Sequence, residues 1–309
     1  MKWLDLVYRA GITTRNQSYK QWVGKFIYDQ FYITGSKSNV AGSVADGSFY
    51  STQLTSDFLA TASKDLGDLT LSLTLANHIR SDISQGIDIS GSGLVVDGLY
   101  NVSNRLSPQP GASEGDANSR QYAVYGRFKA GYKDFLFLEA TGRNDWVSVL
   151  DPAHNSFFYP ALSMSFIPQS AFPQLKTIEF INSLKLRAGW SQVGNINIGA
   201  YALRPTFGQA NGFPYSTGAG FTTGNTLVAR DLKPEITNGW ELGFDGEFYK
   251  NRITAGLTFY TTSTTDQTVA VGISTATGFS SFRTNTGRLL IKVLKPCCMY
   301  HPLRMRNGN

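Results

Sequence analysis

The chain has 309 residues, 31 of them glycine, with Trp, Tyr and Phe together at 13% and charged residues at only 16%. Strand formers and turn formers dominate this composition, so it predicts an all-β chain. No apolar run approaches the roughly 18 residues of a transmembrane helix. The formal net charge is +6, but four basic residues at 292–306 account for most of it, and no basic stripe remains elsewhere. We therefore expect no nucleic-acid partner.

About eleven segments alternate apolar and polar side chains with a period of two, which predicts strands with one dry and one wet face. The alternation is strictest at 238–262, where a two-residue connection at Lys250–Asn251 predicts an antiparallel hairpin. In chain order we expect strands at 2–14, about 19–33, 48 to about 62, 69–79, 120–131, 135–146, 157–167, 184–194, 238–249, 252–262 and 281 to about 290.

Short and long connections alternate between these strands. The expected short ones are 15–18, 64–68, 132–134 and 250–251, with 168–182 a longer member that holds one helical turn. The expected long ones are 34–47, 81–119, 147–156, 195–237 and 266–280. Outer-membrane barrels have short turns at one rim and long external loops at the other. The pattern favours an antiparallel transmembrane β-barrel segment, with an extracellular β-sandwich binding module as the alternative.

Alternate side chains of such a wall face lipid and the water-filled lumen, so outer-membrane lipid is an expected partner. The residues expected to face lipid are Leu71, Leu73, Leu136, Leu138, Leu184, Leu186, Leu242, Phe244, Leu257 and Phe259. The residues expected to line the lumen are Arg127, Lys129, Glu139, Arg143, Lys185, Arg187, Glu241, Asp245 and Glu247.

Signals of catalysis or metal binding are weak. The three histidines are far apart in sequence and the two cysteines are adjacent, so we expect no metal site and no cofactor. The carboxylates of Glu241, Asp245 and Glu247 share a strand face, and solvation of a lumen wall explains them better than acid–base catalysis. The glycines at 208–224 lack the Gly-Lys-Ser/Thr of a phosphate loop. We expect no enzyme, and a barrel-type outer-membrane enzyme is a second alternative.

Candidate ligand contacts come from the long connection at 195–237. Its aromatic residues Tyr201, Phe207, Phe213 and Tyr215 are suited to stack on sugar rings or on peptide side chains. Packing of the loop against its neighbours explains the same residues equally well, and both interpretations stay open.

Five segments, in order, resemble the barrel of SusC/RagA-type TonB-dependent outer-membrane receptors of the Bacteroidetes. They are YGRFKAGYKDFLFLEATGRNDWVSV, FFYPALSMSFIPQ, INSLKLRAGWSQVGN, LKPEITNGWELGFDGEFYKNRITAGLTFYTTSTTD and FRTNTGRLL. The family motifs among them are Arg-x-Asp at 143–145, Leu-Lys-Pro-Glu at 232–235, Glu-Leu-Gly at 241–243 and Asn-Arg at 251–252. Each motif is weak alone, but their order makes the resemblance specific over about residues 1–290.

The resemblance implies a 22-stranded barrel closed by an N-terminal plug, located in the cell outer membrane. It implies energised import of a nutrient such as an oligosaccharide or peptide. The implied partners are a SusD-like surface lipoprotein and the TonB energy-transduction complex, which would bind through an N-terminal part not recognisable here. About eleven strands are about half of such a barrel, so we expect a fragment of the transporter.

The character of the chain changes at Ile291. From there it reads IKVLKPCCMYHPLRMRNGN, with both cysteines, two of the four methionines and no acidic residue. The strand alternation also stops. We therefore expect a partial β-barrel domain at 1–290 and an aberrant basic tail at 291–309, in which translation has left the family reading frame through a frameshift or a sequencing error. A genuine disordered tail is the alternative.

The tail hypothesis is tested on the DNA. Translation from codon 290 in the two other frames should restore alternating strands and the Asn-Lys-Gly-x-Glu pattern that follows Asn-Thr-Gly-Arg-Leu in the resembled family. If neither frame restores them, the change of frame is refuted and the tail is genuine.

Overall fold

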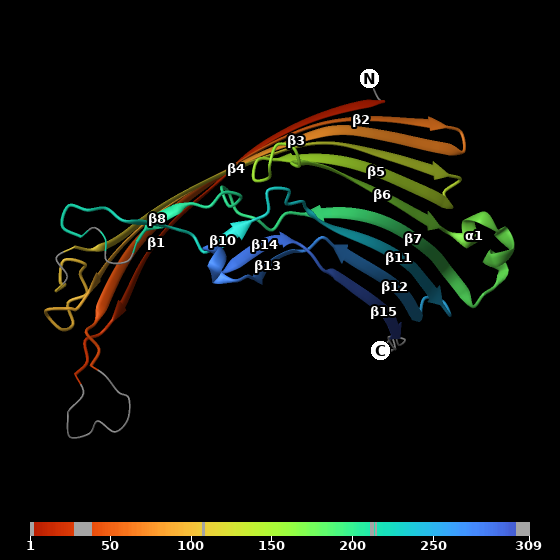
Figure 1. Ribbon diagram of the computed structural model, residues 1–309. Coiled ribbons are helices and arrows are strands. Elements are labelled where there is room, and N and C mark those ends of the chain that lie inside the picture. Colours follow the sequence, from red (N-terminus) through yellow and green to blue (C-terminus); the bar gives the residue numbers. More distant parts are fainter. Residues whose placement is uncertain (1–2, 28–38, 107–108, 211–212, 214, 301–309) are drawn as a thin grey trace, which may run out of the picture. The chain divides into compact units, whose positions relative to one another are not determined.

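The computed structural model describes residues 3–27, 39–106, 109–210, 213 and 215–300 (Figure 1). Ten long strands form one antiparallel sheet, in the order β1-β2-β3-β4-β5-β6-β7-β11-β12-β15. Their bounds are β1 Leu4–Val23, β2 Ser43–Leu66, β3 Leu69–Ser92, β4 Gly111–Tyr132, β5 Leu136–Val147, β6 Ser156–Phe166, β7 Ile181–Asn195, β11 Glu235–Phe248, β12 Ile253–Thr265 and β15 Arg288–Tyr300. The predicted all-β antiparallel fold is confirmed.

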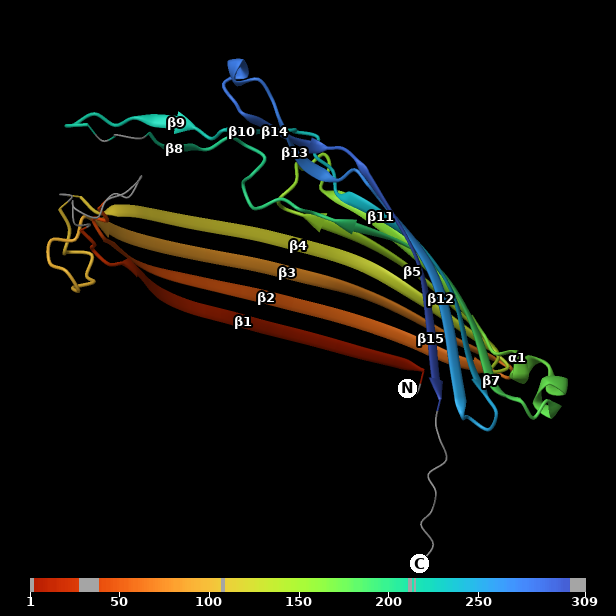
Figure 2. The same cartoon turned by 90° about the horizontal axis from the view of Figure 1, so that it is seen from below.

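Smaller elements occupy the connections. A three-stranded sheet has the order β10-β14-β13, and a two-stranded sheet pairs β8 with β9 (Figure 2). Their bounds are β8 Phe207–Gln209, β9 Phe221–Thr223, β10 Thr226–Val228, β13 Thr268–Gly272 and β14 Ser281–Asn285. The helices are α1 at Pro168–Ala171 and two 3₁₀ turns at Pro173–Thr177 and Thr275–Thr277. The helical turn expected within 168–182 is therefore present.

The chain divides into two compact units. The first comprises residues 1–9, 57–79 and 121–309, and the second comprises 10–56 and 80–120. Within the second unit, Leu94 and Val44 are fully buried, and Gly42 (φ +77°) lies so close to Leu94 that an added Cβ would be 2.9 Å from its Cδ1 atom. Asn104 closes the loop after β3, because its amide group donates to the carbonyl oxygens of Val96 and Leu99.

Two predicted breaks in the N-terminal strands are wrong. No turn occurs at 15–18, because β1 runs without interruption to Val23. The segment Arg15–Ser18 contains no Gly or Pro, and its exposed polar side chains are compatible with either face of a strand. The connection predicted at 81–119 is also too long, since β3 continues to Ser92 and β4 begins at Gly111. The predicted strand end at 28–33 lies outside the described residues.

The hairpin expected at 238–262 is present, but its turn is longer than predicted. Strand β11 ends at Phe248, whose register partner is Ile253, so four residues make the turn instead of two. Tyr249, Lys250 and Asn251 all have left-handed backbone, with φ values of 52°, 57° and 62°. Such a run of αL residues is uncommon for non-glycine side chains, and the pattern of strand alternation gives no sign of it.

Two other short connections lie next to each other, as a barrel rim requires. Gly67 (φ +63°) and Asp68 join β2 to β3, and residues 133–135 join β4 to β5. Lys133 Nζ lies 3.2 Å from Asp68 Oδ2, and this contact raises the pKa of Lys133. The turn predicted at 132–134 is therefore confirmed to within one residue, and the turn predicted at 64–68 is shorter than expected, because β2 continues to Leu66.

Register in the first unit separates two faces of the sheet. Leu242 is directly opposite Phe259 on β12 and Ala188 on β7, whereas Asp245 is opposite Lys185. Directly opposed residues of antiparallel strands lie on the same face. All the residues expected to face lipid from Leu136 onward share one face, and all those expected to line the lumen share the other.

The apolar face is strongly exposed. Trp240 is 60% exposed and Leu242 is 58% exposed, and no helix among the described residues is long and apolar enough to cross a membrane. A contiguous exposed apolar face requires an apolar cover. Each strand from β5 to β12 in this sheet has at least eleven residues, enough to cross a bilayer when tilted.

The buried core of the first unit lies in the connections, which we call the loop layer (residues 148–155, 196–234 and 266–287). Leu150 and Leu232 are almost fully buried there against Val228, with Phe282 of β14 packed beside them. The side chain of Asn285 fixes the layer: it accepts from Lys233 N–H at 2.7 Å and donates to the carbonyl oxygens of Lys233 and Asp266, both at 2.8 Å. The described parts of the long connections predicted at 195–237 and 266–280 thus contain short strands of their own.

Strand β15 crosses the boundary predicted at 290 and pairs with β12 as far as Tyr300. Its register places Lys292 opposite Thr261, on the apolar face, and Ile291 opposite Thr262, on the polar face. The rule that separates the faces of β5 to β12 therefore does not hold for β15. The boundary itself stays a prediction, because backbone pairing does not depend on the side chains that a strand carries. Residues 301–309 lie outside the described residues.

A lysine on the apolar face tests its contact with lipid. In the natural full-length protein, Leu242→Lys or Phe244→Lys should reduce assembly, because lysine at the bilayer midplane on a barrel's lipid face costs roughly 2–4 kcal/mol. The measurement is the fraction of heat-modifiable barrel on gels. Glu247→Lys is the matched control, since Glu247 is on the other face of β11, opposite Thr254 and Ser183. Equal loss in all three variants would mean that the faces are assigned wrongly.

Candidate functional site

Ion pairs link neighbouring strands along the polar face. Arg187 on β7 bridges two carboxylates of β11: its Nε lies 2.9 Å from Asp245 Oδ2, and its Nη1 lies 3.3 Å from Glu241 Oε1. Lys129 on β4 lies 3.4 Å from Glu139 on β5. These side chains are one-third to one-half exposed, so each pair is worth little in stability. The pairs instead hold charged groups at fixed positions on the polar face of the sheet.

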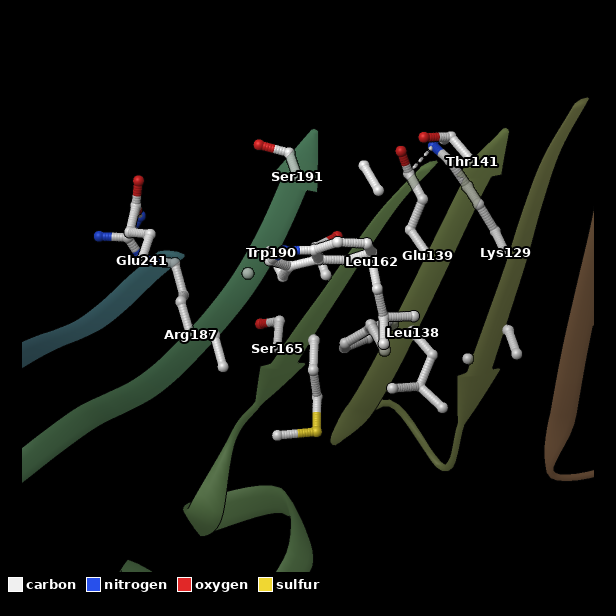
Figure 3. A pocket seen from close by; sticks show the side chains of 18 of the residues that line it. Lys129, Leu138, Glu139, Thr141, Leu162, Ser165, Arg187, Trp190, Ser191 and Glu241 are labelled. Atoms are coloured by element: carbon white, nitrogen blue, oxygen red, sulfur yellow. Dashed lines mark hydrogen bonds and ion pairs between the residues drawn. The ribbon is translucent and has the colours of Figure 1, made fainter. Parts of the chain in front are cut away.

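The lining of a hollow of about 1230 Å³ includes Lys129, Glu139, Arg187 and Glu241. Figure 3 shows Lys129, Glu139 and Thr141 together on one side of it, and Arg187 with Glu241 on the other. Strands β2 to β7, β11 and β12 contribute to its lining, which includes Ser191. Both signs of charge and several hydroxyl groups therefore line this hollow, together with Leu138, Leu162 and Trp190 of the apolar face.

The remaining charged residues of the predicted lumen set lie on the same face. Arg127 is opposite Thr141, Lys185 is opposite Asp245, and Glu247 is opposite Ser183. Lys185 and Asp245 are direct register neighbours, but the ion pair of Asp245 is made with Arg187. That this face lines a lumen stays a prediction.

The most buried charge of the polar face is Asp145, only 3% exposed. Arg143 Nη2 lies 2.8 Å from its Oδ1 atom, Gln121 Nε2 donates to it at 3.2 Å, and the Tyr159 hydroxyl donates a short hydrogen bond. The guanidinium of Arg143 also lies over the ring of Tyr125, 5.5 Å from its centroid. The network ties β4, β5 and β6 together.

Arg143 belongs to the predicted lumen set, whereas Asp145, Gln121 and Tyr159 were not predicted from the sequence. The Arg-x-Asp spacing at 143–145 was the available signal, because residues two apart in a strand share a face. A second missed pair joins His78 to Asp57, with 2.6 Å between Nδ1 and Oδ1. Among the described residues, no group of three or more His, Cys, Asp or Glu side chains is arranged to hold a metal ion.

The four aromatic residues predicted to contact ligand are all exposed. Phe207 and Tyr215 are 74% and 77% exposed, and Phe213 lies against Gly220 near the end of the β8–β9 hairpin. Tyr201 lies apart from that hairpin, in a turn with φ +63°. Phe221 on β9 is equally exposed and was not singled out from sequence. Three of the four predicted residues thus belong to one hairpin, and their contact with ligand stays a prediction.

A wide antiparallel sheet with long strands, one exposed apolar face and one face of ion pairs has the features of a transmembrane β-barrel wall. The family model described as "TonB dependent receptor-like, beta-barrel" matches residues 3–292. The chain belongs to this family of TonB-dependent receptors. Proteins of the family lie in the outer membrane, which is the location of this chain. The predicted partial barrel is thereby confirmed, and the β-sandwich alternative is wrong.

Two curated relatives share part of the sequence. The TonB-dependent receptor P39 of Formosa agariphila is 31% identical over 166 residues, which are 53% of this chain and 16% of that protein. The TonB-dependent receptor SusC of Bacteroides thetaiotaomicron is 32% identical over 137 residues, which are 42% of this chain and 14% of that protein. The matched parts thus span about a sixth of these relatives.

Solved structures agree in fold. The structure of the RagAB peptide transporter matches this chain with a TM-score of 0.82 and 17% identity. The match covers 99% of this chain and 33% of the RagAB chain. The RagAB peptide importer in the closed-closed state gives a TM-score of 0.84 at 18% identity, with the same coverage. At this identity the likeness establishes the fold, and the chain spans about a third of the matched structures.

Burial predicts which ion pair matters for stability. Asp145→Asn should lower the free energy of unfolding by about 2 kcal/mol, because Asp145 is buried and hydrogen bonds to a charged group are worth roughly 1.5–3 kcal/mol. Glu139→Gln, in the half-exposed pair with Lys129, should cost below about 1 kcal/mol. Reversible urea unfolding in detergent or lipid, followed by tryptophan fluorescence, measures both. Equal costs would contradict the assignment of Asp145 as a buried anchor.

Proposed function

We propose that this chain is part of the barrel wall of a SusC-like TonB-dependent transporter that imports a nutrient across the outer membrane. The observation that carries the proposal is the separation of faces between β5 and β12: exposed apolar side chains on one face, cross-strand ion pairs on the other. A wall between lipid and a wet lumen needs both faces, and a soluble receptor domain needs neither. The family match supports the same conclusion.

The proposed cargo is an oligosaccharide or a peptide. Both are too large for ordinary diffusion through a porin, and both present groups that suit this chain. Sugar rings and apolar peptide side chains stack on exposed aromatic residues such as Phe207 and Tyr215. The fixed charges of Arg187, Glu241 and Asp245 suit the polar backbone and termini of a peptide. RagAB, whose fold this chain shares, is described as a peptide importer.

The proposed partners follow from the same relatives. SusC and RagAB resemble this chain in sequence or in fold, which supports a SusD-like surface lipoprotein as a partner. TonB would supply the energy through another part of the protein. Transport alone is proposed here and no catalytic step, because the family consists of transporters and receptors. A barrel-type enzyme has no specific observation in its favour.

The proposal is tested by uptake in the source bacterium. Deletion of the gene should abolish growth on the cognate nutrient, offered as a defined oligopeptide mixture or a defined oligosaccharide mixture, and loss of TonB should have the same effect. In the intact strain, Phe207→Ala with Tyr215→Ala should raise the half-saturating nutrient concentration about fivefold, since an aromatic stacking contact contributes roughly 0.5–1.5 kcal/mol.

The control variant is Phe172→Ala, an exposed aromatic residue in the connection that holds α1, outside the long loops. Its uptake should match that of the unaltered protein. Undiminished growth of the deletion strain on both mixtures would refute the transport function for these nutrients. A surface lipoprotein that co-purifies with the protein in mild detergent would support the SusD-like partner.

A further inference from the structure

A second hollow, of about 440 Å³, lies in the loop layer and shares no lining residue with the larger one. The segment that follows β7 lines it through residues 196–199, and the three-stranded sheet β10-β14-β13 lines it through Thr268, Ala270 and Arg283. Ile196 and Ile198 pack against the buried core, whereas Asn197 and Gly199 are exposed. The hollow is therefore bounded by ordered segments on two sides.

Arg283 is the only charged residue in the lining of this hollow. It is half-buried, and among the described residues its guanidinium has no ion pair or hydrogen bond. By comparison, Arg143 and Arg187 are paired with carboxylates, and Arg252 lies over the ring of Tyr249. Its guanidinium nitrogens are not among the buried unpartnered atoms of the described residues, so its five donors stay accessible to water and to a ligand that enters the hollow.

The backbone around Arg283 is held firmly. It pairs with Ala270 of β13 in antiparallel register and with Val228 of β10 in parallel register. Two residues further along β14, Asn285 clamps Lys233 and Asp266. Glu235, an acidic residue near this hollow, directs its carboxylate to the Thr268 backbone N–H at 2.9 Å. The protein thus fixes the backbone of Arg283, and the backbone N–H of Thr268, itself a lining residue of the hollow, holds the Glu235 carboxylate.

We propose that this hollow binds a carboxylate group of the imported nutrient, with Arg283 as its bidentate partner. A guanidinium matches the two oxygens of a carboxylate in a planar fork, which makes arginine the preferred residue for that group. The Asn197 amide and the Thr268 hydroxyl supply neutral donors in the same lining. The inference rests on the proposed transport function, because it treats the ligand as cargo.

The size of the hollow limits what enters it. Ligand pockets commonly measure about 300–1,000 Å³, so this one accommodates a single terminal unit and not a whole oligomer. Two nutrient classes carry a carboxylate on such a unit: the C-terminal residue of a peptide and a uronic acid of an oligosaccharide. The chemistry is shared, and the experiment separates the two sources.

The test is calorimetric titration of the natural full-length protein in detergent with two matched probe pairs. One pair is tetra-alanine and its C-terminal amide, and the other is tri-galacturonate and its methyl ester. The unaltered protein should bind one acid at least about tenfold more tightly than its neutral partner, the factor expected for one charge-assisted bidentate contact. The pair that shows the difference identifies the source of the carboxylate.

Three variants complete the test. Arg283→Gln should remove the preference for the acid, and Arg283→Lys should retain only part of it, because lysine keeps the charge but loses the fork. Arg230→Gln is the control: Arg230 is an exposed arginine of the same loop layer, absent from the lining of the hollow, and its loss should change nothing. Heat modifiability on gels checks that each variant is folded.

The inference is overturned if the unaltered protein binds neither acid more tightly than its neutral partner. It is also overturned if the preference survives in Arg283→Gln, or if Arg230→Gln removes it equally. If Arg283→Gln does not fold, the folded Arg283→Lys variant decides. An undiminished preference for the acid over its neutral partner then refutes the bidentate contact, and a reduced preference supports it. The two proposals can fail separately. If the unaltered protein shows no preference for the acid but Arg283→Gln still takes up the nutrient, the carboxylate site is refuted and the transport function is not.

Discussion

The register of the antiparallel sheet is the constraint on which the rest of the structure depends. Each residue is opposite one partner on each neighbouring strand, and successive residues face opposite sides, so one pairing assigns every side chain of a strand to a face. The pairing of Leu242 with Phe259 and Ala188 therefore also fixes the places of Glu241 and Asp245. A slip by one residue would move Arg187 and its two carboxylates into the apolar face. The observed register keeps the charges on the polar face, and a slip by an odd number of residues would not.

Within that frame, burial decides what each charged pair contributes. The pairs of Lys129 and Arg187 lie where water competes for both partners, and they mainly set the electrostatic pattern of the wall. Asp145 is different, because three side chains supply its hydrogen bonds and hold β4, β5 and β6 in one arrangement. The Arg-x-Asp motif at 143–145 thus serves as a structural anchor in the fold.

The loop layer has the tight packing that the wall lacks. The long strands leave apolar side chains such as Trp240 and Leu242 exposed on one face, so the wall obtains few dry contacts from the chain itself. The loops obtain theirs from Leu150, Val228 and Leu232, and from the side chain of Asn285, which joins two loops through three hydrogen bonds. Arg283 gains its fixed position from this packing, as does the hollow beside it.

The sequence by itself determined the class of fold, the two faces of β5 to β12 and the charged set from Arg127 to Glu247, because a period of two needs no knowledge of distant partners. It misjudged β1, where exposed polar residues on both faces hide the strand, and the turn at Tyr249–Arg252, where backbone geometry and not side-chain pattern sets the length. Asp145, the core around Leu232 and the unpaired Arg283 depend on contacts between segments up to tens of residues apart. Only the tertiary structure decides such contacts, because burial and hydrogen-bond partners arise when those segments meet.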